Sequence, residues 1–324
     1  MEINWYPGHM AKARRQLQEQ LKRVDVVIEL CDARLPRASR NPELDKMIGG
    51  RQRVLVFGKS DLADPSQTEK WVRFYREQGF LCTAVDMNRQ ARQVLQLIDK
   101  ATAPAVNRAA QRGIRKTVRA MVVGVPNVGK STFINRLYGG GIAKVGDKPG
   151  VTRANQWVKV SPYLEVLDTP GLLWPRLDDR LSARRLAYIA AIRDQVVDTG
   201  MLTLQLLYDM IDVCPQQVLK RYNLKPEDLS LKGEALLEAV CRGRGFLMKG
   251  GVCDTERACG VVLDEFRAGR LGRITLEEFE RYARREGAPR QAEKTAQAAA
   301  DGTVKEENPH ADEPAGTAAA IDGN

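Results

Sequence analysis

The feature that most constrains the fold is the octapeptide at residues 124–131, which reads Gly-Val-Pro-Asn-Val-Gly-Lys-Ser. It fits the pattern G-x-x-x-x-G-K-[ST], and it lies between a predicted strand over 119–125 and a predicted helix over 130–137. In this setting, backbone N–H groups and the positive end of the helix surround phosphate oxygens. The spacing therefore predicts a phosphate-binding loop (P-loop) in an α/β sheet.

The P-loop pattern also predicts roles for individual residues. We expect Lys130 to reach the β- and γ-phosphates of a bound nucleotide, with a catalytic effect, and the Ser131 hydroxyl to ligate Mg²⁺. The residues expected to surround the phosphates are Asn127, Val128, Gly129, Lys130, Ser131 and Thr132.

Two weaker motifs follow the P-loop. Asp168 opens an Asp-Thr-Pro-Gly motif directly after a predicted strand over 164–167, so its carboxylate can hold Mg²⁺ and the Gly171 N–H can face a γ-phosphate. Between the P-loop and this motif stands Thr152, which we expect to complete the metal shell and assist catalysis when a triphosphate is bound. Their order and spacing behind a P-loop make the combination specific.

The loop that would recognise the base lies upstream instead of downstream. No K-x-D motif follows Gly171, but Gly-Lys-Ser-Asp occurs at 58–61, after a predicted strand over 53–57. The Asp61 carboxylate can accept hydrogen bonds from guanine N1–H and N2–H₂, a pair of donors that adenine lacks. Guanine is therefore the expected base and GTP or GDP the expected nucleotide; the remaining base-loop residues are Lys59, Ser60, Thr83 and Ala84.

This order of motifs indicates a circularly permuted GTPase domain. The base loops precede the P-loop, whereas the usual order places them after the D-x-x-G motif. Predicted strands alternate with predicted helices, which indicates an α/β fold with a doubly wound, mostly parallel sheet. The predicted strands are 24–31, 53–57, 80–85, 119–125, 157–160 and 164–167, and the predicted helices between them are 67–78, 90–101 and 130–137. From about residue 181 only helices are predicted, at 182–192, 215–222, 233–241, 254–268 and 275–285.

Composition indicates the cellular location of the protein and the charge of its partner. No apolar run approaches the length of a membrane span, and no secretory signal is present, so we expect a cytoplasmic protein, and we expect it to be a monomer. The six cysteines form no C-x-x-C pair and only two histidines occur, which argues against zinc. Residues 1–286 carry a net charge of +14 and residues 287–324 carry −4, so the body favours a polyanionic partner, although a merely soluble basic protein fits the charge as well.

Further motifs narrow the class. They are Trp-Tyr-Pro-Gly-His-Met with Ala-Lys-Ala at 5–13, Asp-Ala-Arg-Leu-Pro at 32–36, Arg-Gly-Phe-Leu with Lys-Gly-Gly at 244–251, and Gly-Arg-Ile-Thr-Leu-Glu at 272–277. With these motifs, residues 1–286 resemble the ribosome biogenesis GTPase A family (YlqF/RbgA) of circularly permuted GTPases. The resemblance implies a GTPase that acts on the large ribosomal subunit and its rRNA at a late stage of assembly.

The patterns along the chain, together with the resemblance, predict how the chain is divided. Residues 1–101 would form the base-recognition half of the GTPase domain, and 119–180 the half with the P-loop and switch motifs. Residues 102–118 would be a linker, and 181–286 an all-helical domain that binds RNA or the ribosome. The tail, 287–324, has scarcely any large apolar residue and is expected to be disordered. Candidates for rRNA contact are a basic helix over 11–23 and Arg242, Arg244, Lys249, Arg270 and Arg273.

Three positions bear on activity. Leu172 occupies the place of a water-orienting Gln, so the resemblance implies a slow basal rate. His9 is the family's candidate for the missing catalytic group, though a structural or ribosome-contact role is equally open. Asn127 either coordinates K⁺, as in similar GTPases, or only hydrogen-bonds its own loop.

The sequence departs from the family pattern at Gly58, where that pattern has Asn. The Asn side chain helps to hold the base and ties the base loop to the P-loop, so weaker nucleotide binding is expected. Two other functions remain open: a GTPase switch acting on a non-ribosomal protein, and an ATP-using P-loop enzyme, against which Asp61 argues.

Overall fold

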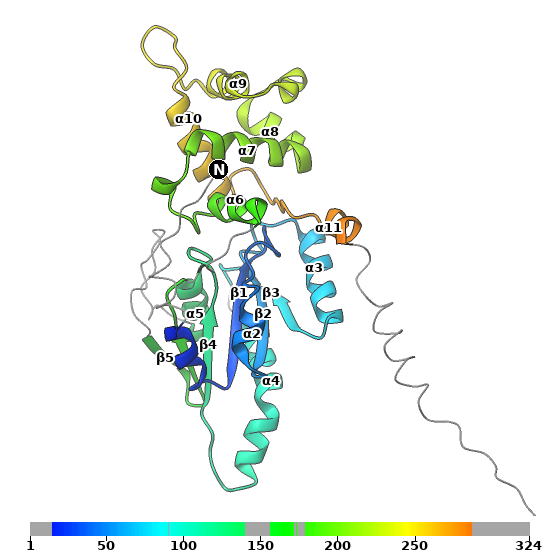
Figure 1. The fold of residues 1–324 in the computed structure, drawn as a ribbon, viewed down its shortest axis with the longest axis vertical. Coiled ribbons are helices and arrows are strands. Elements are labelled where there is room, and N and C mark those ends of the chain that lie inside the picture. The colour runs from blue at the N-terminus through cyan, green and yellow to red at the C-terminus, as the bar shows by residue number, and fades with distance from the viewer. Residues whose placement is uncertain (1–14, 90, 140–155, 172, 174–178, 287–324) are drawn as a thin grey trace, which may run out of the picture. The chain divides into compact units, whose positions relative to one another are not determined.

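The structure, a computed structural model, describes residues 15–89, 91–139, 156–171, 173 and 179–286. One six-stranded sheet has the order β3-β2-β1-β4-β6-β5 (Figure 1). The strands are β1 (Val26–Asp32), β2 (Gln52–Gly58), β3 (Leu81–Ala84), β4 (Val118–Val123), β5 (Gln156–Ser161) and β6 (Leu164–Asp168). Every neighbouring pair is parallel except β5 and β6, which are antiparallel. The predicted α/β class and mostly parallel sheet are confirmed.

Helices account for most of the remaining described residues. They are α2 (Leu44–Ile48), α3 (Pro65–Glu77), α4 (Arg92–Ala110), α5 (Lys130–Tyr138), α6 (Arg180–Tyr188), α7 (Thr199–Val213), α8 (Pro215–Tyr222), α9 (Glu234–Arg244), α10 (Thr255–Arg267) and α11 (Phe279–Glu286). Residues 15–21 are also helical. Among the described residues no strand follows β6, which confirms the predicted helical C-terminal part.

Successive side chains of a strand point to opposite faces of the sheet. Both faces of this sheet carry buried apolar side chains, and helices pack on each of them. On one face, Val27 and Met121 belong to an apolar cluster with Leu17 and Leu21 of the helix over 15–21 and with residues of α2. On the other face, the alternate residues of β1, β2 and β4 belong to a cluster with α4 and α5. That second cluster continues into α6–α10, so the sheet and the C-terminal helices share one apolar core.

A buried ion pair joins the end of β1 to α10. Arg34 donates from Nε to Asp32 Oδ1 at 2.9 Å and from Nη2 to Asp32 Oδ2 at 2.8 Å. Its Nη1 atom donates to the carbonyl oxygen of Phe266 at 2.8 Å, and the guanidinium lies 5.0 Å from the centre of the Phe266 ring. Arg34 is only 1% exposed and Asp32 is fully buried. This pair connects α10 to the carboxyl end of β1 and gives the motif at 32–36 a structural role.

The segment after α10 returns to the sheet domain. The N–H of Ile274 donates to the carbonyl oxygen of Leu62 at 3.0 Å, and the N–H of Leu276 donates to that of Arg34 at 3.1 Å. The Glu277 carboxylate then accepts from the N–H groups of Arg37 and Ala38. The motif at 272–277 is therefore a strap across the segments that follow β1 and β2.

We expect Arg34→Ala to lower the free energy of unfolding by about 3–5 kcal/mol, because it leaves the Asp32 carboxylate buried without its bidentate partner. Urea unfolding followed by circular dichroism measures this. The matched control is Arg73→Ala, since the Arg73–Glu69 pair is exposed (side chains 66% and 73%). The control should change stability by no more than about 0.5 kcal/mol. Equal effects of the two variants would contradict a stabilising role for the buried pair.

Several element predictions were wrong or incomplete, and helix α2 was not predicted. The predicted linker over 102–118 is helical as far as Ala110, because α4 continues through an Ala-rich stretch with high helix propensity, despite Pro104. The predicted helix over 275–285 begins only at Phe279, since the preceding residues form the strap. Helix α7 was not predicted, although Asp198 caps it by accepting from the N–H of Met201. No helix among the described residues is long and apolar enough to cross a bilayer.

Candidate nucleotide-binding site

The predicted functional loops meet at one edge of the sheet. Strands β2, β3, β4 and β6 run in the same direction, so the loops that follow them emerge at their shared carboxyl edge. Strand β1 lies between β2 and β4. The chain adds β2 and β3 on one side of β1 and then places β4, β6 and β5 on its other side, so the order of the strands changes direction at β1. Ligands of open α/β sheets bind outside the carboxyl ends of strands at such a switch point.

The P-loop has the backbone shape that phosphate binding requires. Asn127 and Gly129 have positive φ values of 58° and 97°, and α5 begins at Lys130. These turns bring backbone N–H groups and the helix N-terminus to one side of the loop. Gly124 packs so closely against the carbonyl of Leu30 that a Cβ atom there would overlap it. The loop is therefore held directly against the end of β1.

The Lys130 ammonium is turned back onto its own loop. Its Nζ atom donates to the carbonyl oxygens of Gly124 at 3.2 Å and Val125 at 3.0 Å. Burial lowers the pKa of Lys130 to about 8, and the nearby negative charge of Asp168 opposes this effect. A bound phosphate would add negative charge and so favour the charged ammonium.

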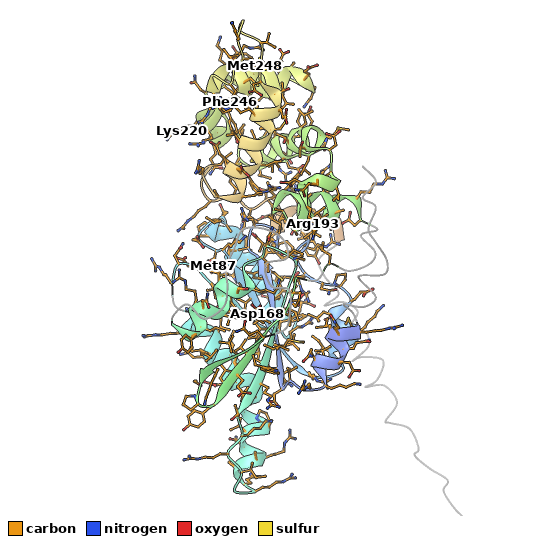
Figure 2. All side chains as sticks on the ribbon, turned by 90° about the vertical axis from the view of Figure 1, so that its left-hand side faces the viewer. Met87, Asp168, Arg193, Lys220, Phe246 and Met248 are labelled. Atoms are coloured by element: carbon orange, nitrogen blue, oxygen red, sulfur yellow. The ribbon has the colours of Figure 1, made fainter. Side chains whose placement is uncertain are left out.

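Ser131 and Asp168 meet as a magnesium site would require. The Ser131 hydroxyl donates to Asp168 Oδ2 at 2.8 Å. A hydroxyl and a carboxylate are hard oxygen ligands of the kind Mg²⁺ selects. Gly171 lies against the P-loop, because a Cβ atom there would be 2.5 Å from the Cα atom of Pro126. The described parts of the two motifs are therefore in direct contact, and Figure 2 shows Asp168 in the sheet part of the chain.

The base loop contacts the P-loop directly. Lys59 has a positive φ of 56°, and its Nζ atom donates to the carbonyl oxygen of Asn127 at 2.9 Å. The same ammonium lies 3.5 Å from Asp32 Oδ2. Burial alone would raise the pKa of Asp32, but the positive charges of Arg34 and Lys59 outweigh it and hold that pKa well below its usual range. Asp32 therefore remains ionised and anchors Lys59.

The predicted guanine acceptor is fixed by the loop after β3. Asp61 Oδ1 accepts from the N–H of Met87 at 3.3 Å, and Oδ2 accepts from Asn88 Nδ2 at 3.0 Å. The N–H of Ser60 donates to the carbonyl oxygen of Val85 at 3.2 Å. A surface depression of about 420 Å³ reaches Ser60, Asp61, Thr83 and Ala84, but much of its remaining lining comes from α3, and no P-loop residue lines it.

Comparison with known proteins agrees with this geometry. A family model described as a 50S ribosome-binding GTPase matches residues 119–231. Ribosome biogenesis GTPase A of Bacillus cereus is 44% identical over 87% of this chain and 96% of its own length. The chain belongs to the ribosome biogenesis GTPase A family. The 50S ribosome-binding model begins at residue 119, so the upstream base loops lie outside its match.

Solved structures support this family membership at the level of the fold. A GDP-bound structure of Thermotoga maritima YlqF has a TM-score of 0.61 and 26% sequence identity, covering 82% of this chain and 100% of that one. A GNP-bound structure of the same protein gives the same TM-score and identity, covering 82% and 98%. Each match covers more of this chain than either the sheet part or the helical part alone.

Two predicted catalytic residues of this family member lie outside the described residues: His9 and Thr152. Leu172 lies outside them as well. The structure brings the other predicted site residues to the same edge of the sheet, and their roles remain predictions. Asn127 has an additional contact, because its Nδ2 atom donates to the carbonyl oxygen of Ala190 at 2.8 Å.

Sequence reasoning missed four residues of this site. Asp32 anchors Lys59, Asn88 and Met87 hold Asp61, and Ala190 accepts from the P-loop. Asp32 carried a usable signal, since it follows a buried strand within a motif of the family. The other three residues contact loops that are distant in the sequence, so no regular spacing predicts these contacts.

Proposed function

We propose that the protein is a GTP-hydrolysing assembly factor that binds the large ribosomal subunit through rRNA, promotes its late maturation and is released after hydrolysis. The observation that carries the nucleotide part is the Lys59 contact with the Asn127 carbonyl, which places the guanine-type loop against the P-loop. The ribosomal part rests on family membership and on the net positive charge of residues 1–286.

In this proposal the site residues act as follows. Lys130 stabilises charge that develops on the phosphates, and Asp61 selects guanine by accepting two hydrogen bonds. Ser131, Asp168 and Thr152 would hold Mg²⁺, which neutralises phosphate charge when bound. His9 would orient the attacking water, in place of a side chain that Leu172 does not supply. K⁺ would bind near Asn127.

The helical part is proposed to read the nucleotide state. The Asn127 amide contacts the carbonyl of Ala190, which directly follows α6 and has a positive φ of 55°. Any movement of the P-loop that accompanies nucleotide binding would therefore alter a contact with the helices. Loss of the γ-phosphate would release the switch motifs, from which the chain runs directly into α6.

The exposed basic side chains of the helical part are the proposed rRNA contacts. They are Arg242, Lys249, Arg270 and Arg273. Arg244 is excluded from this group, because it is partly buried, donates to the carbonyl of Arg221 and pairs with Glu265 at 3.2 Å. Its role is to stabilise the packing of α8, α9 and α10. The proposed domain boundaries otherwise follow the sequence prediction, with α4 extending to Ala110.

The test is the GTP hydrolysis rate of the purified protein with and without purified large ribosomal subunits. We expect a slow basal rate and stimulation of about tenfold or more, because the subunit would complete a site that lacks a water-orienting group. Small subunits at the same concentration are the control for non-specific RNA. Stimulation by neither subunit would overturn the ribosomal part and favour a protein partner instead.

The same assay separates two finer roles. His9→Ala measured at saturating large subunits should lose the stimulation, and an unchanged rate would remove His9 from the mechanism.

Potassium buffer should give a higher rate than sodium buffer, and equal rates would remove K⁺ from the site.

A further inference from the structure

We propose that Met87 replaces the missing asparagine of the base loop as the positioning residue that holds this loop against the P-loop. The inference rests on the proposed function, since it concerns how guanine nucleotide is held. Gly58 has no side chain to connect the two loops, yet they remain in contact. Some other group must occupy the space between them.

The Met87 side chain occupies that space. A Cβ atom built on Gly58 would lie 3.5 Å from both Sδ and Cε of Met87, and 3.2 Å from Leu30 Cδ1. A Cβ atom built on Gly129 of the P-loop would lie only 2.8 Å from Met87 Cε and 3.9 Å from Lys59 Cε. The Met87 thioether therefore lies between the glycine of the base loop and the glycine of the P-loop.

The backbone of Met87 is fixed on both sides. Its N–H donates to Asp61 Oδ1 at 3.3 Å, and its carbonyl oxygen accepts from Arg136 Nε of α5 at 2.8 Å. Met87 is only 8% exposed, and it lies in the sheet part of the chain (Figure 2). Because its backbone contacts the guanine acceptor and its side chain contacts the P-loop, one residue connects base recognition to phosphate binding.

The chemistry of this connection differs from that of an asparagine. A carboxamide would connect the loops by hydrogen bonds in which it both donates and accepts. A thioether contributes only dispersion contacts, and its unbranched, flexible chain adapts to irregular gaps. Asparagine and methionine would compete for the same volume. Gly58 and Met87 are therefore a compensating pair, in which an asparagine at position 58 requires a smaller side chain at position 87.

The pair predicts a non-additive double-mutant cycle in GDP affinity, measured by titration calorimetry on the full chain. Met87→Ala should weaken GDP binding about tenfold, because it empties the space between the loops. Gly58→Asn alone should give no tighter binding, because Met87 and Leu30 crowd its side chain. In the Met87→Ala background, Gly58→Asn should tighten GDP binding by about tenfold, because the carboxamide then has room to connect the loops.

Two controls distinguish positioning from general destabilisation. Met201→Ala removes an exposed methionine of α7 (55% exposed) and should leave GDP affinity unchanged. Inosine diphosphate lacks the N2 amino group that Asp61 would bind. Met87→Ala should therefore reduce the preference for GDP over inosine diphosphate, whereas a purely structural loss would weaken both equally. Met87→Leu, which refills the space, should retain the affinity and the preference of the wild type.

The experiment distinguishes a failure of the Met87 proposal from a failure of the proposed function. If the wild type binds GDP and Gly58→Asn changes the affinity by the same factor in both backgrounds, the Met87 proposal is overturned and the proposed function stands. An unchanged affinity of Met87→Ala overturns it as well. If the wild type binds neither GDP nor GTP, the proposed function fails and this inference fails with it.

Discussion

Lys130→Ala is expected to lower the rate of GTP hydrolysis by about 10²–10³-fold, both in the basal reaction and with large ribosomal subunits present. The ammonium is buried and donates to the carbonyl oxygens of Gly124 and Val125. A buried cation in a preorganised position stabilises developing phosphate charge more than a solvated cation does, because the surrounding dielectric is low. Removing it takes away the main positive charge contributed by the P-loop itself.

A matched lysine on the same sheet provides the control. Lys159 lies exposed on β5, and Lys159→Ala should leave the rate unchanged. Single-turnover hydrolysis at saturating GTP separates the chemical step from nucleotide affinity, which Lys130→Ala should also weaken. A Lys130→Ala rate within twofold of the Lys159→Ala rate would show that another group stabilises the phosphates.

The second large effect is expected from Asp61→Asn, which should weaken GDP binding by about 10³-fold and improve the binding of xanthosine diphosphate. The carboxylate accepts from two guanine donors, whereas an amide presents one acceptor and one set of donors. Xanthine carries a carbonyl oxygen where guanine has the N2 amino group, so an amide at position 61 fits xanthine. The predicted result is a change of base preference and not a loss of binding alone.

Competition against a labelled nucleotide measures both affinities in one series. Asp99→Asn, on the exposed side of α4, removes one negative charge away from the site and should change neither affinity. If Asp61→Asn kept the affinity of the wild type for GDP, Asp61 would not be the guanine acceptor. The loop over 58–61 would then lose its assigned role.

Much of the fold could be predicted from the sequence, because the signals were local. The P-loop needs a strand, a glycine turn and a helix in succession, and β4, Gly129 and α5 provide them. The predicted base loop precedes the P-loop in the sequence, and this order indicated the permutation. The sheet order β3-β2-β1-β4-β6-β5 agrees with it. Helix α7 was missed, although its Asp198 cap and apolar spacing are local signals that could have identified it.

Much of the site could not be predicted, because its contacts join loops that are distant in the chain. The Asn127–Ala190 hydrogen bond spans 63 residues, and the Arg34–Phe266 bond spans 232. The space beside Gly58 is occupied by Met87, which no motif singles out. Sequence patterns predict which residue types a loop needs, but the filling of a gap between loops depends on the packed structure.

The strap over residues 274–277 has a consequence for how the protein is made. Leu62 and Arg34 emerge early in synthesis, but their backbone partners, Ile274 and Leu276, are among the last residues of the folded body to be translated. Domains fold as units once their contacts are available, and contacts of long sequence separation form late. The contacts of the strap with Leu62 and Arg34 can therefore form only after residue 276 has been translated. A truncated product that ends before the strap would contain every predicted nucleotide motif and still lack the backbone contacts at Leu62 and Arg34.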